Sequence, residues 1–402
     1  MKVVIAIDSL KGSLSSLEAG NAIREGVLRA MPEAEVLVKP VADGGEGTCD
    51  ALVDALGGKR VTVEVTGPYG DPVQACYGWL PEQNLAVMEM AAAAGITLSP
   101  KRQPREATTF GVGQMIVDAL DRGCRDFLIG IGGSATNDGG IGMLTALGFQ
   151  FLDRQGAPCG ITGGELGRVA RVELAGARRE LADCRFRIAC DVNNPLCGET
   201  GCTYIFGPQK GVKPEQRPAL DADMSYYADA TAAALGRDFR DTPGAGAAGG
   251  LGFAFLAYLR GELKPGIQLV LDAIGLEECL QGADLVVTGE GCLDEQTVFG
   301  KTPAGVAQCA KGLGVPVVAL AGGIRPGAEV CNRRGIDAYF AILPRVMTLE
   351  EAMAPETARK NMVQTAEQVF RLIFALGQNR QEIGVPPENS GVSASRRKKK
   401  LT

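Results

Sequence analysis

The sequence predicts an α/β fold in which a doubly wound parallel-sheet domain is interrupted by a second, inserted α/β domain. Short apolar runs repeatedly precede polar, glycine-rich turns and helical patterns, which is the order expected of βαβ units. This pattern changes after residue 70 and resumes near residue 282. We therefore expect one discontinuous domain from residues 1–70 and 281–376, an inserted domain from residues 71–280, and a disordered basic tail from residues 377–402.

Length and composition agree with two domains of the ordinary globular kind. The chain has 402 residues, more than one hydrophobic core usually organises, and 46% of them are hydrophobic while 22% are charged. No apolar run approaches the roughly 20 residues that span a bilayer. The net charge of −6 argues against general nucleic-acid binding. We expect a cytoplasmic protein without a membrane or nucleic-acid partner, and we leave a homodimer open as its assembly.

The residue types that the chain lacks restrict its chemistry. Histidine is absent, so Ser-His-Asp and Cys-His catalysis are excluded and a general base must be Asp, Glu, Lys, Tyr or Cys. The 12 cysteines are scattered and never form a C-x-x-C pair. This spacing favours reduced thiols over a zinc site.

The stretch from Phe127 to Gly148 is the most informative part of the chain. A strand is expected at 127–131, and an apolar helical pattern begins at Ile141. The turn between them is rich in glycine, which lets backbone N–H groups approach an anion. The carboxylate of Asp138 would repel a phosphate unless a divalent cation lay between them. The alternative is that Asn137 or Asp138 only caps the helix.

Two strands in the first fifty residues also end in acidic turns. The first is expected at 3–7, before a helix at 16–30, and the second at 36–41. Ligands of open α/β sheets bind at the carboxyl ends of the strands, although a residue such as Asp8 could equally start the helix. The polar side chains at these ends are Asp8, Ser9 and Lys11 after the first strand, and Asp43 and Glu46 after the second.

The middle of the chain adds a third acidic strand end. Residues 73–80 and 85–90 predict an antiparallel hairpin, and a helix is expected at 108–122. A strand at 186–190 then ends in Asp191. The glycine- and proline-rich segment that follows predicts a long ordered loop, which carries Lys210.

Near the C-terminus the βαβ pattern returns. Strands are expected at 284–288, 315–320 and 339–343, and a last helix at 355–376. The segment GEGCLDEQTVFGKT follows the first of these strands and ends like a P-loop. That motif needs glycine where this chain has Glu295, so nucleotide binding of the P-loop kind is not expected. No G-x-G-x-x-G follows the first strand of the chain, which weakens a dehydrogenase interpretation.

Seven carboxylates beside strand ends and glycine-rich turns cannot all be helix caps. Such a cluster is costly unless cations neutralise it, and magnesium with a phosphorylated ligand is the simplest solution. The pattern therefore indicates phosphoryl transfer with an aspartate as the base. The seven residues are Asp8, Asp43, Glu46, Asp138, Asp191, Glu290 and Asp294.

Eight motifs then resemble the glycerate kinase family of the bacterial type-1 kind, in the expected order over residues 1–376. They are DSLKGSLSS, PVADGGEGT, TGPYG, IGIGGSATNDGG, CDVNNPLCG, FGPQKG, PGAGAAGGLG and TGEGCLDEQTVFGKTPAGVA. The resemblance implies a Rossmann-like domain split by a second α/β domain, with the active site between them. It also implies ATP-dependent phosphorylation of D-glycerate, most often to 2-phosphoglycerate. A glycerate 3-kinase, a kinase for a related hydroxy acid and a non-catalytic ligand-binding regulator are the alternatives.

Within the motifs we assign roles as hypotheses, with ATP and Mg²⁺ as cofactors. Asp191 is the first candidate for the base and Asp294 the second, with Lys11 as a catalytic cation. The nucleotide is expected at Gly132, Gly133, Ser134, Thr136, Asn137 and Gly289, and the metal at Asp138 and Glu290. The substrate is expected at Asp8, Ser9, Asp43, Glu46 and Lys210. This assignment requires Asp43, Asp138, Asp191 and Asp294 to converge on one cavity.

Overall fold

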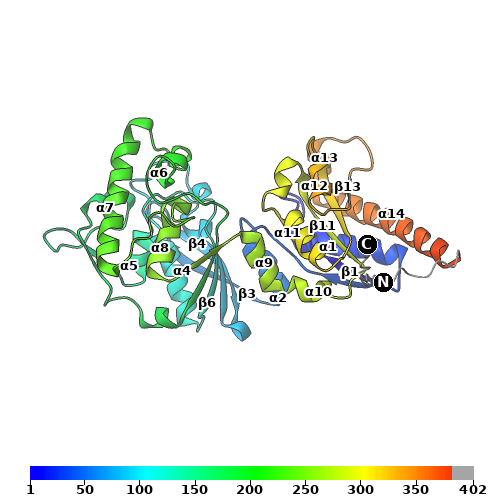
Figure 1. Ribbon diagram of the computed structural model, residues 1–402, viewed down its shortest axis with the longest axis horizontal. Helices are drawn as coiled ribbons and strands as arrows, with labels where there is room; N and C mark the ends of the chain where they lie inside the picture. The colour runs from blue at the N-terminus through cyan, green and yellow to red at the C-terminus, as the bar shows by residue number, and fades with distance from the viewer. Residues whose placement is uncertain (383–402) are drawn as a thin grey trace, which may run out of the picture.

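The structure, a computed structural model, describes residues 1–382 and contains two main sheets toward opposite ends of an elongated molecule (Figure 1). The first sheet has five parallel strands in the order β13-β12-β11-β1-β2. The direction of strand order reverses between β1 and β11, and ligands of open α/β sheets bind at such a point. The strands are β1 (Lys2–Ile5), β2 (Glu35–Val38), β11 (Leu285–Leu293), β12 (Val317–Ile324) and β13 (Ala338–Ala341).

Helices cover both faces of this sheet, which confirms the doubly wound architecture. Val3 and Ile5 pack with helices α1 (Ser16–Ala30) and α14 (Pro355–Glu382), whereas Val4 and Ala6 face the opposite core. Strands buried on both faces read as continuous apolar runs, as they do in this sequence. The opposite face is covered by α9 (Gly266–Ile274), α10 (Leu276–Leu280), α11 (Thr302–Gly312) and α12 (Val330–Arg333).

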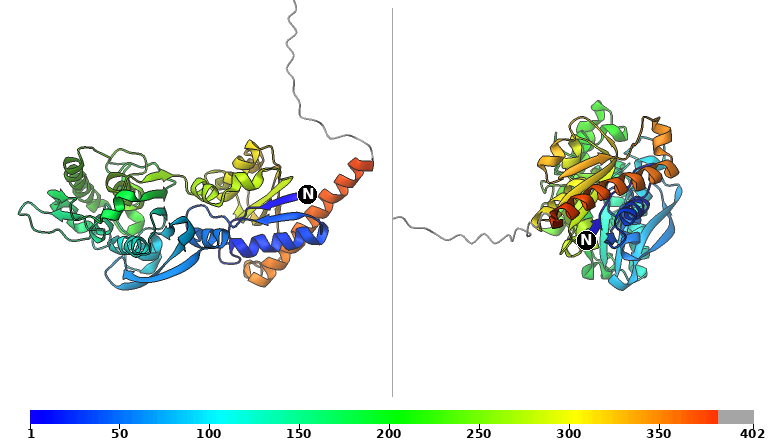
Figure 2. Two further views of the ribbon diagram at one scale, coloured as in Figure 1. Left: turned by 90° about the horizontal axis from the view of Figure 1, so that it is seen from below. Right: turned by 90° about the vertical axis from the view of Figure 1, so that its right-hand side faces the viewer.

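Helix α1 begins and ends where the sequence predicts it. Its start is fixed by a capping box, in which the Glu18 backbone N–H donates to Ser15 Oγ at 3.2 Å and the Ser15 N–H donates to Glu18 Oε2 at 2.8 Å. On its far side, a Cβ on Gly26 would lie 2.4 Å from the Val363 carbonyl oxygen. Glycine therefore lets α1 and α14 run side by side, as Figure 2 shows.

The second sheet has six strands in the order β10-β9-β6-β5-β4-β3. Strands β3, β4 and β5 pair antiparallel, which confirms the predicted hairpin, and β5, β6, β9 and β10 pair parallel. Their bounds are β3 (Lys59–Thr66), β4 (Pro72–Leu80), β5 (Leu85–Glu89), β6 (Asp126–Gly130), β9 (Arg185–Ala189) and β10 (Glu262–Lys264). One face is covered by α3 (Ala91–Ala94), α4 (Phe110–Asp121), α5 (Ile141–Ala146), α6 (Cys202–Ile205), α7 (Arg217–Leu235) and α8 (Leu251–Tyr258), with a small sheet of β7 (Gln150–Leu152) and β8 (Arg171–Glu173).

Helices α2 (Thr48–Leu56) and α9 lie between the two sheets (Figure 1). Leu52 of α2 and Val270 of α9 belong to one core that also takes in residues of both sheets, such as Val87 and Val286. By strand pairing the chain enters the six-stranded sheet with β3, before the predicted boundary near residue 70. The division into two domains stays a prediction.

The C-terminal helix α14 runs to Glu382, past the predicted end at residue 376, and short α13 (Leu349–Met353) precedes it. The rest of the predicted basic tail, residues 383–402, lies outside the described part of the chain. Among the described residues, no helix combines the length and the apolar character that crossing a membrane would require.

Candidate active site

A large cavity opens at the carboxyl end of the five-stranded sheet, beside the point where its strand order reverses. Its volume is about 850 Å³. Its charged end contains six predicted residues, and its other end is apolar. The predicted residues are Asp8, Ser9, Lys11, Asp43, Glu290 and Asp294.

Asp8 occupies the end of β1 and is held from two sides. The Thr302 hydroxyl donates to Asp8 Oδ2 at 2.8 Å, and the Ser9 N–H donates to Asp8 Oδ1 at 2.6 Å. Burial raises the pKa of Asp8, and the nearby charge of Asp43 raises it further, although the bonds from Thr302 and Ser9 act in the opposite direction. Keeping Asp8 ionised at this position therefore costs free energy, as is common for carboxylates at functional sites.

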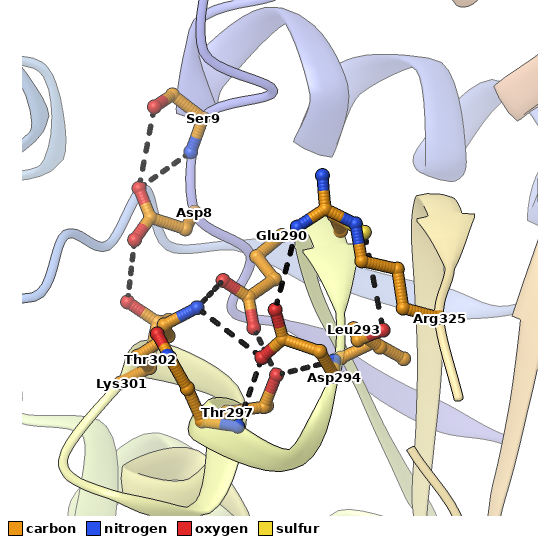
Figure 3. A network of polar contacts seen from close by, with 11 residues as sticks. Asp8, Ser9, Glu290, Leu293, Asp294, Thr297, Lys301, Thr302 and Arg325 are labelled. Atoms are coloured by element: carbon orange, nitrogen blue, oxygen red, sulfur yellow. Dashed lines mark hydrogen bonds and ion pairs between the residues drawn. The ribbon is translucent and has the colours of Figure 1, made fainter. Parts of the chain in front are cut away.

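A cation network lies beside Asp8 at the end of β11 (Figure 3). Lys301 Nζ lies 3.4 Å from Glu290 Oε2 and 3.8 Å from Asp294 Oδ1, and Arg325 approaches Asp294 Oδ2 at 3.9 Å. The Thr297 hydroxyl donates to Glu290 Oε1 at 2.7 Å. Burial raises the pKa of Glu290, Thr297 and Lys301 oppose that rise, and the charge of Asp8 adds to it.

Lys301, Thr302 and Arg325 are functional candidates that the sequence did not assign. Lys301 and Arg325 line the large cavity, and Thr302 positions Asp8. The segment Gly300–Thr302 stood out in the sequence only as an incomplete P-loop. The better signal for Lys301 was the number of carboxylates in the segment before it. So many carboxylates require nearby cations, and a lysine directly after the segment can supply one.

A smaller cavity, of about 320 Å³, lies at the carboxyl ends of β6 and β9 in the second sheet. Asp43 lines both this small cavity and the large one, so the two meet at the turn that follows β2. Six of the predicted residues line the small cavity: Asp43, Gly132, Gly133, Ser134, Asp191 and Lys210.

Asp191 projects from the end of β9 and lies beside the turn that carries Asp43. The Gly266 N–H at the start of α9 donates to Asp191 Oδ1 at 3.0 Å. A Cβ on Gly44 would lie only 2.4 Å from the Gly266 Cα, so two glycines allow the Asp43 turn to pack against this helix start. Partial burial raises the pKa of Asp191, and the charge of Asp43 raises it further.

Lys210 is a buried cation at the wall of the small cavity. Its side chain is almost fully buried, and Nζ donates to the Thr136 carbonyl at 2.6 Å. Burial lowers the pKa of Lys210 to about 8. A carboxylate or a phosphate bound in the cavity would compensate the charge of the buried ammonium. Lys210 is therefore a candidate for binding an anion.

Gly132 leaves space on the same wall. A Cβ built there would meet nothing within 4 Å, and its φ lies outside the left-handed region. Neither packing nor backbone conformation therefore explains the glycine. A ligand that approaches this backbone closely does.

Five predicted site residues line neither of these two cavities: Glu46, Thr136, Asn137, Asp138 and Gly289. Asp138 is fully buried, and Thr136 and Asn137 are also buried. Gly289 is explained by packing, because a Cβ there would lie 1.8 Å from the Leu320 carbonyl oxygen on the neighbouring strand. Their burial and packing therefore give no support to the expected contacts of Thr136, Asn137, Asp138 and Gly289 with nucleotide phosphates or magnesium, and these assignments stay predictions.

Asp138 instead ties together two segments that pack against the six-stranded sheet. Its Oδ2 accepts from the Thr109 N–H and hydroxyl, both at 2.8 Å, and its Oδ1 accepts from the Gly140 N–H at 3.2 Å. Asp138 therefore positions the starts of α4 and α5. Of the four carboxylates expected to converge, Asp43, Asp191 and Asp294 line the joined cavities, and Asp138 does not.

The substitution Asp138→Asn should destabilise the protein without a specific loss of magnesium binding. The N–H groups of the asparagine amide would face N–H or hydroxyl donors that now bond the carboxylate. These buried donors would lose their acceptor, which should lower the free energy of unfolding by about 1–3 kcal/mol. Urea denaturation measures this loss. Asp153→Asn is the matched control, because Asp153 Oδ1 accepts two backbone N–H groups in an exposed turn. Unchanged stability with a weakened magnesium requirement would return Asp138 to the metal site.

Glu46 lies apart from the two joined cavities. It lines an adjacent hollow of about 390 Å³, which it shares with Ser9 and Lys11. Lys11 is exposed and makes no ion pair among residues 1–376, whose side chains the structure describes, so its ammonium can reach either the hollow or the large cavity.

The carboxylates fit magnesium held jointly with phosphate oxygens better than magnesium held by protein alone. Within residues 1–382, no three His, Cys, Asp or Glu side chains are grouped closely enough to form a metal cage. Magnesium at kinase sites usually takes one or two carboxylates, several waters and the substrate phosphates. Asp43 and Asp191 suit this arrangement, since Oδ2 of each accepts no hydrogen bond from the described residues.

Comparisons with known proteins agree with the fold and with the resemblance of the motifs. A family model described as the glycerate kinase family matches residues 3–374. A glycerate kinase of Bacillus subtilis is 49% identical over 92% of this chain and 97% of its own length. A glycerate 2-kinase of Escherichia coli is 46% identical over 88% of this chain and 93% of its own. A crystal structure of a glycerate kinase 2 from Salmonella typhimurium LT2 superposes with a TM-score of 0.87 at 44% identity, covering 94% of this chain and 99% of that one.

Proposed function

We propose that this chain, which belongs to the glycerate kinase family, transfers the γ-phosphoryl group of ATP to the 2-hydroxyl of D-glycerate. The observation that carries the proposal is the small cavity, which is lined by the strand-end carboxylate Asp191, by the buried Lys210 and by the glycine-rich turn at Gly132. Asp191 supplies a base, and the lysine supplies a cation that can bind an anion. The turn supplies backbone that an anion can approach closely. Glycerate offers a hydroxyl and a carboxylate that match them.

In this arrangement glycerate occupies the small cavity. A volume of about 320 Å³ suits a three-carbon acid and is small for a nucleoside triphosphate. Lys210 and the backbone at Gly132 hold its carboxylate, and Asp191 accepts the hydroxyl proton. Asp43, which lines both cavities, lies where the phosphoryl group passes from one ligand to the other.

The role of the cofactors follows from the charges of the site. Magnesium bound with ATP neutralises charge on the transferred phosphoryl group. Asp43 would hold it, and Glu290 is a further candidate ligand, which leaves Asp191 free to act as the base. Because phosphoryl transfer depends mainly on positioning and charge neutralisation, both carboxylates and cations are needed around the ligands.

The direct test is ATP turnover with a panel of small hydroxy acids. We expect Mg²⁺-dependent ADP release that requires D-glycerate, followed in a coupled assay. Phosphorus NMR of the product distinguishes 2-phosphoglycerate from 3-phosphoglycerate. Absence of glycerate-dependent ADP release would contradict the proposal, and a 3-phosphate product would correct the site of transfer.

The pH dependence of glycerate use should report on Lys210. Its pKa of about 8 means that the ammonium is present below that pH and lost above it. We expect kcat/KM for glycerate to fall as the pH rises through 8, approaching about tenfold per pH unit. Lys210→Met should lower kcat/KM at neutral pH and remove this decline. An unchanged decline in the variant would assign it to another group.

Assembly and location are separate expectations. A cytoplasmic location and a homodimer both stay predictions. Light scattering coupled to size-exclusion chromatography measures the mass of the assembly directly.

A further inference from the structure

The large cavity has two chemically different ends, and the phosphoryl-transfer residues use only one of them. The charged end contains Asp8, Lys301 and Arg325. The other end is formed by the carboxyl ends of β12 and β13 and by the segment that leads into α13. It is lined by apolar side chains, among them Ile324, Leu343, Leu349 and Met353.

These apolar side chains are unusually open to solvent. Leu349 is 74% exposed, and Ile324 and Leu343 are each 40% exposed. A group of exposed apolar residues around a concavity typically marks a binding site. The same cavity continues into a charged end where Lys11, Lys301 and Arg325 stand among four carboxylates. An occupant with an apolar part and a phosphate part that is held together with a divalent cation suits both ends.

The floor between the two ends is made of backbone. Gly322 and Gly323 of β12 line the cavity. A Cβ on Gly322 would lie 2.6 Å from the Gly291 carbonyl, so packing explains that glycine. A Cβ on Gly323 would meet only Cys292 Sγ at 3.8 Å, and its φ is not positive. The protein itself therefore does not require glycine at 323, whereas a ligand that lies close against the strand does.

We propose that the apolar end of the large cavity binds the purine base of ATP, with the triphosphate running over Gly323 toward Lys301 and Asp43. This inference rests on the proposed kinase function and adds the orientation of the nucleotide. The volume of about 850 Å³ accommodates a nucleotide, whereas the small cavity, at about 320 Å³, suits the acceptor. It follows that the turn at Gly132–Ser134 contacts the acceptor or the transferred group, and not the body of the nucleotide.

Two matched pairs of variants test this placement. Gly323→Val narrows the floor in a strand where valine is well tolerated. Gly312→Val is its control, because a Cβ on Gly312 meets nothing within 4 Å and lies outside the cavity. Leu349→Asn removes an exposed apolar wall, and Val346→Asn is its control, because Val346 is 97% exposed and does not line the cavity.

We expect Gly323→Val and Leu349→Asn each to raise KM for ATP by about tenfold, with KM for glycerate changed by less than about twofold. In calorimetry ADP should bind both variants more weakly by the same factor, whereas inorganic tripolyphosphate should bind the Leu349→Asn variant as it binds the parent protein. Both controls should match the parent. Unchanged ATP and ADP affinities in both cavity variants would overturn the placement, as would an increase in KM for glycerate alone.

The same measurements separate the two proposals. A parent protein that binds ADP at this cavity but releases none from ATP with glycerate would refute the kinase function and support the base site. A parent protein with full glycerate kinase activity whose cavity variants are unaffected would support the function and refute the base site.

Discussion

Asp191→Asn is expected to lower kcat by at least about 100-fold, because it removes the proposed base while leaving the shape of the small cavity intact. Asparagine keeps the Oδ1 that accepts the Gly266 N–H at 3.0 Å, so the approach of β9 to α9 should persist. Loss of the carboxylate leaves the glycerate hydroxyl without an acceptor for its proton. Steady-state kinetics at saturating ATP and glycerate measure the effect.

The direction in which Asp191→Asn changes the free energy of unfolding can also be predicted. The pKa of Asp191 is raised in the folded state, so ionised Asp191 costs stability at neutral pH, and that cost disappears as the pH falls through the raised pKa. Asp191→Asn should therefore be as stable as the parent at neutral pH, or slightly more stable. Asp284→Asn serves as a control, because Asp284 Oδ2 also accepts a backbone N–H, from Lys2 at 2.7 Å, at the start of a strand.

The pH profile supplies a second readout for the same residue. A base must be unprotonated to act, so kcat of the parent should fall as the pH drops through the raised pKa of Asp191. Near-normal turnover in Asp191→Asn would remove this residue from the chemistry. Asp294 would then be tested next. Its carboxylate already lies near two cations, Lys301 and Arg325, which compete with the substrate proton for it.

Strand ends were predictable from the sequence because their signals are local. A short apolar run that stops at Asp8 or Asp191 indicates a buried strand and places the acid at its carboxyl end. Parallel pairing then places each acid at the carboxyl edge of its own sheet. Asp8 lines the large cavity and Asp191 lines the small one. The glycines of the Asp43 turn likewise indicated close backbone contact, which Gly44 makes with Gly266.

The direction in which a side chain points was not predictable. Asp138 and Ser134 belong to one glycine-rich turn, yet Asp138 accepts bonds from Thr109 in the interior while Ser134 lines a cavity. A helix cap and an anion site use the same residue types, so sequence alone leaves both open. The cations were missed for a related reason, because Arg325 reaches Asp294 only through the pairing of β11 with β12.

Lys301→Gln is expected to lower kcat/KM for ATP by about 100-fold, an effect typical of losing one charge that stabilises a transferred phosphoryl group. Lys301 lies within 4 Å of both Glu290 and Asp294, and without it these carboxylates would repel the triphosphate. Lys311→Gln is the matched control. Lys311 lies at the other end of α11 and pairs with Asp337 at 2.8 Å, on the exposed surface.

A double variant decides whether Lys301 acts on the phosphates or only on its acidic neighbour. If Lys301 merely neutralises Glu290, then Lys301→Gln combined with Glu290→Gln should have the same kcat/KM as Glu290→Gln alone, because Glu290 is itself a candidate magnesium ligand. If the ammonium itself contacts the triphosphate, the double variant should have a lower kcat/KM than Glu290→Gln alone, because neither glutamine carries a positive charge. We expect the second result, since Lys301 lies at the charged end of the cavity that the nucleotide would occupy. A Lys301→Gln protein with normal kcat/KM for ATP and reduced stability would show that the lysine only stabilises the fold.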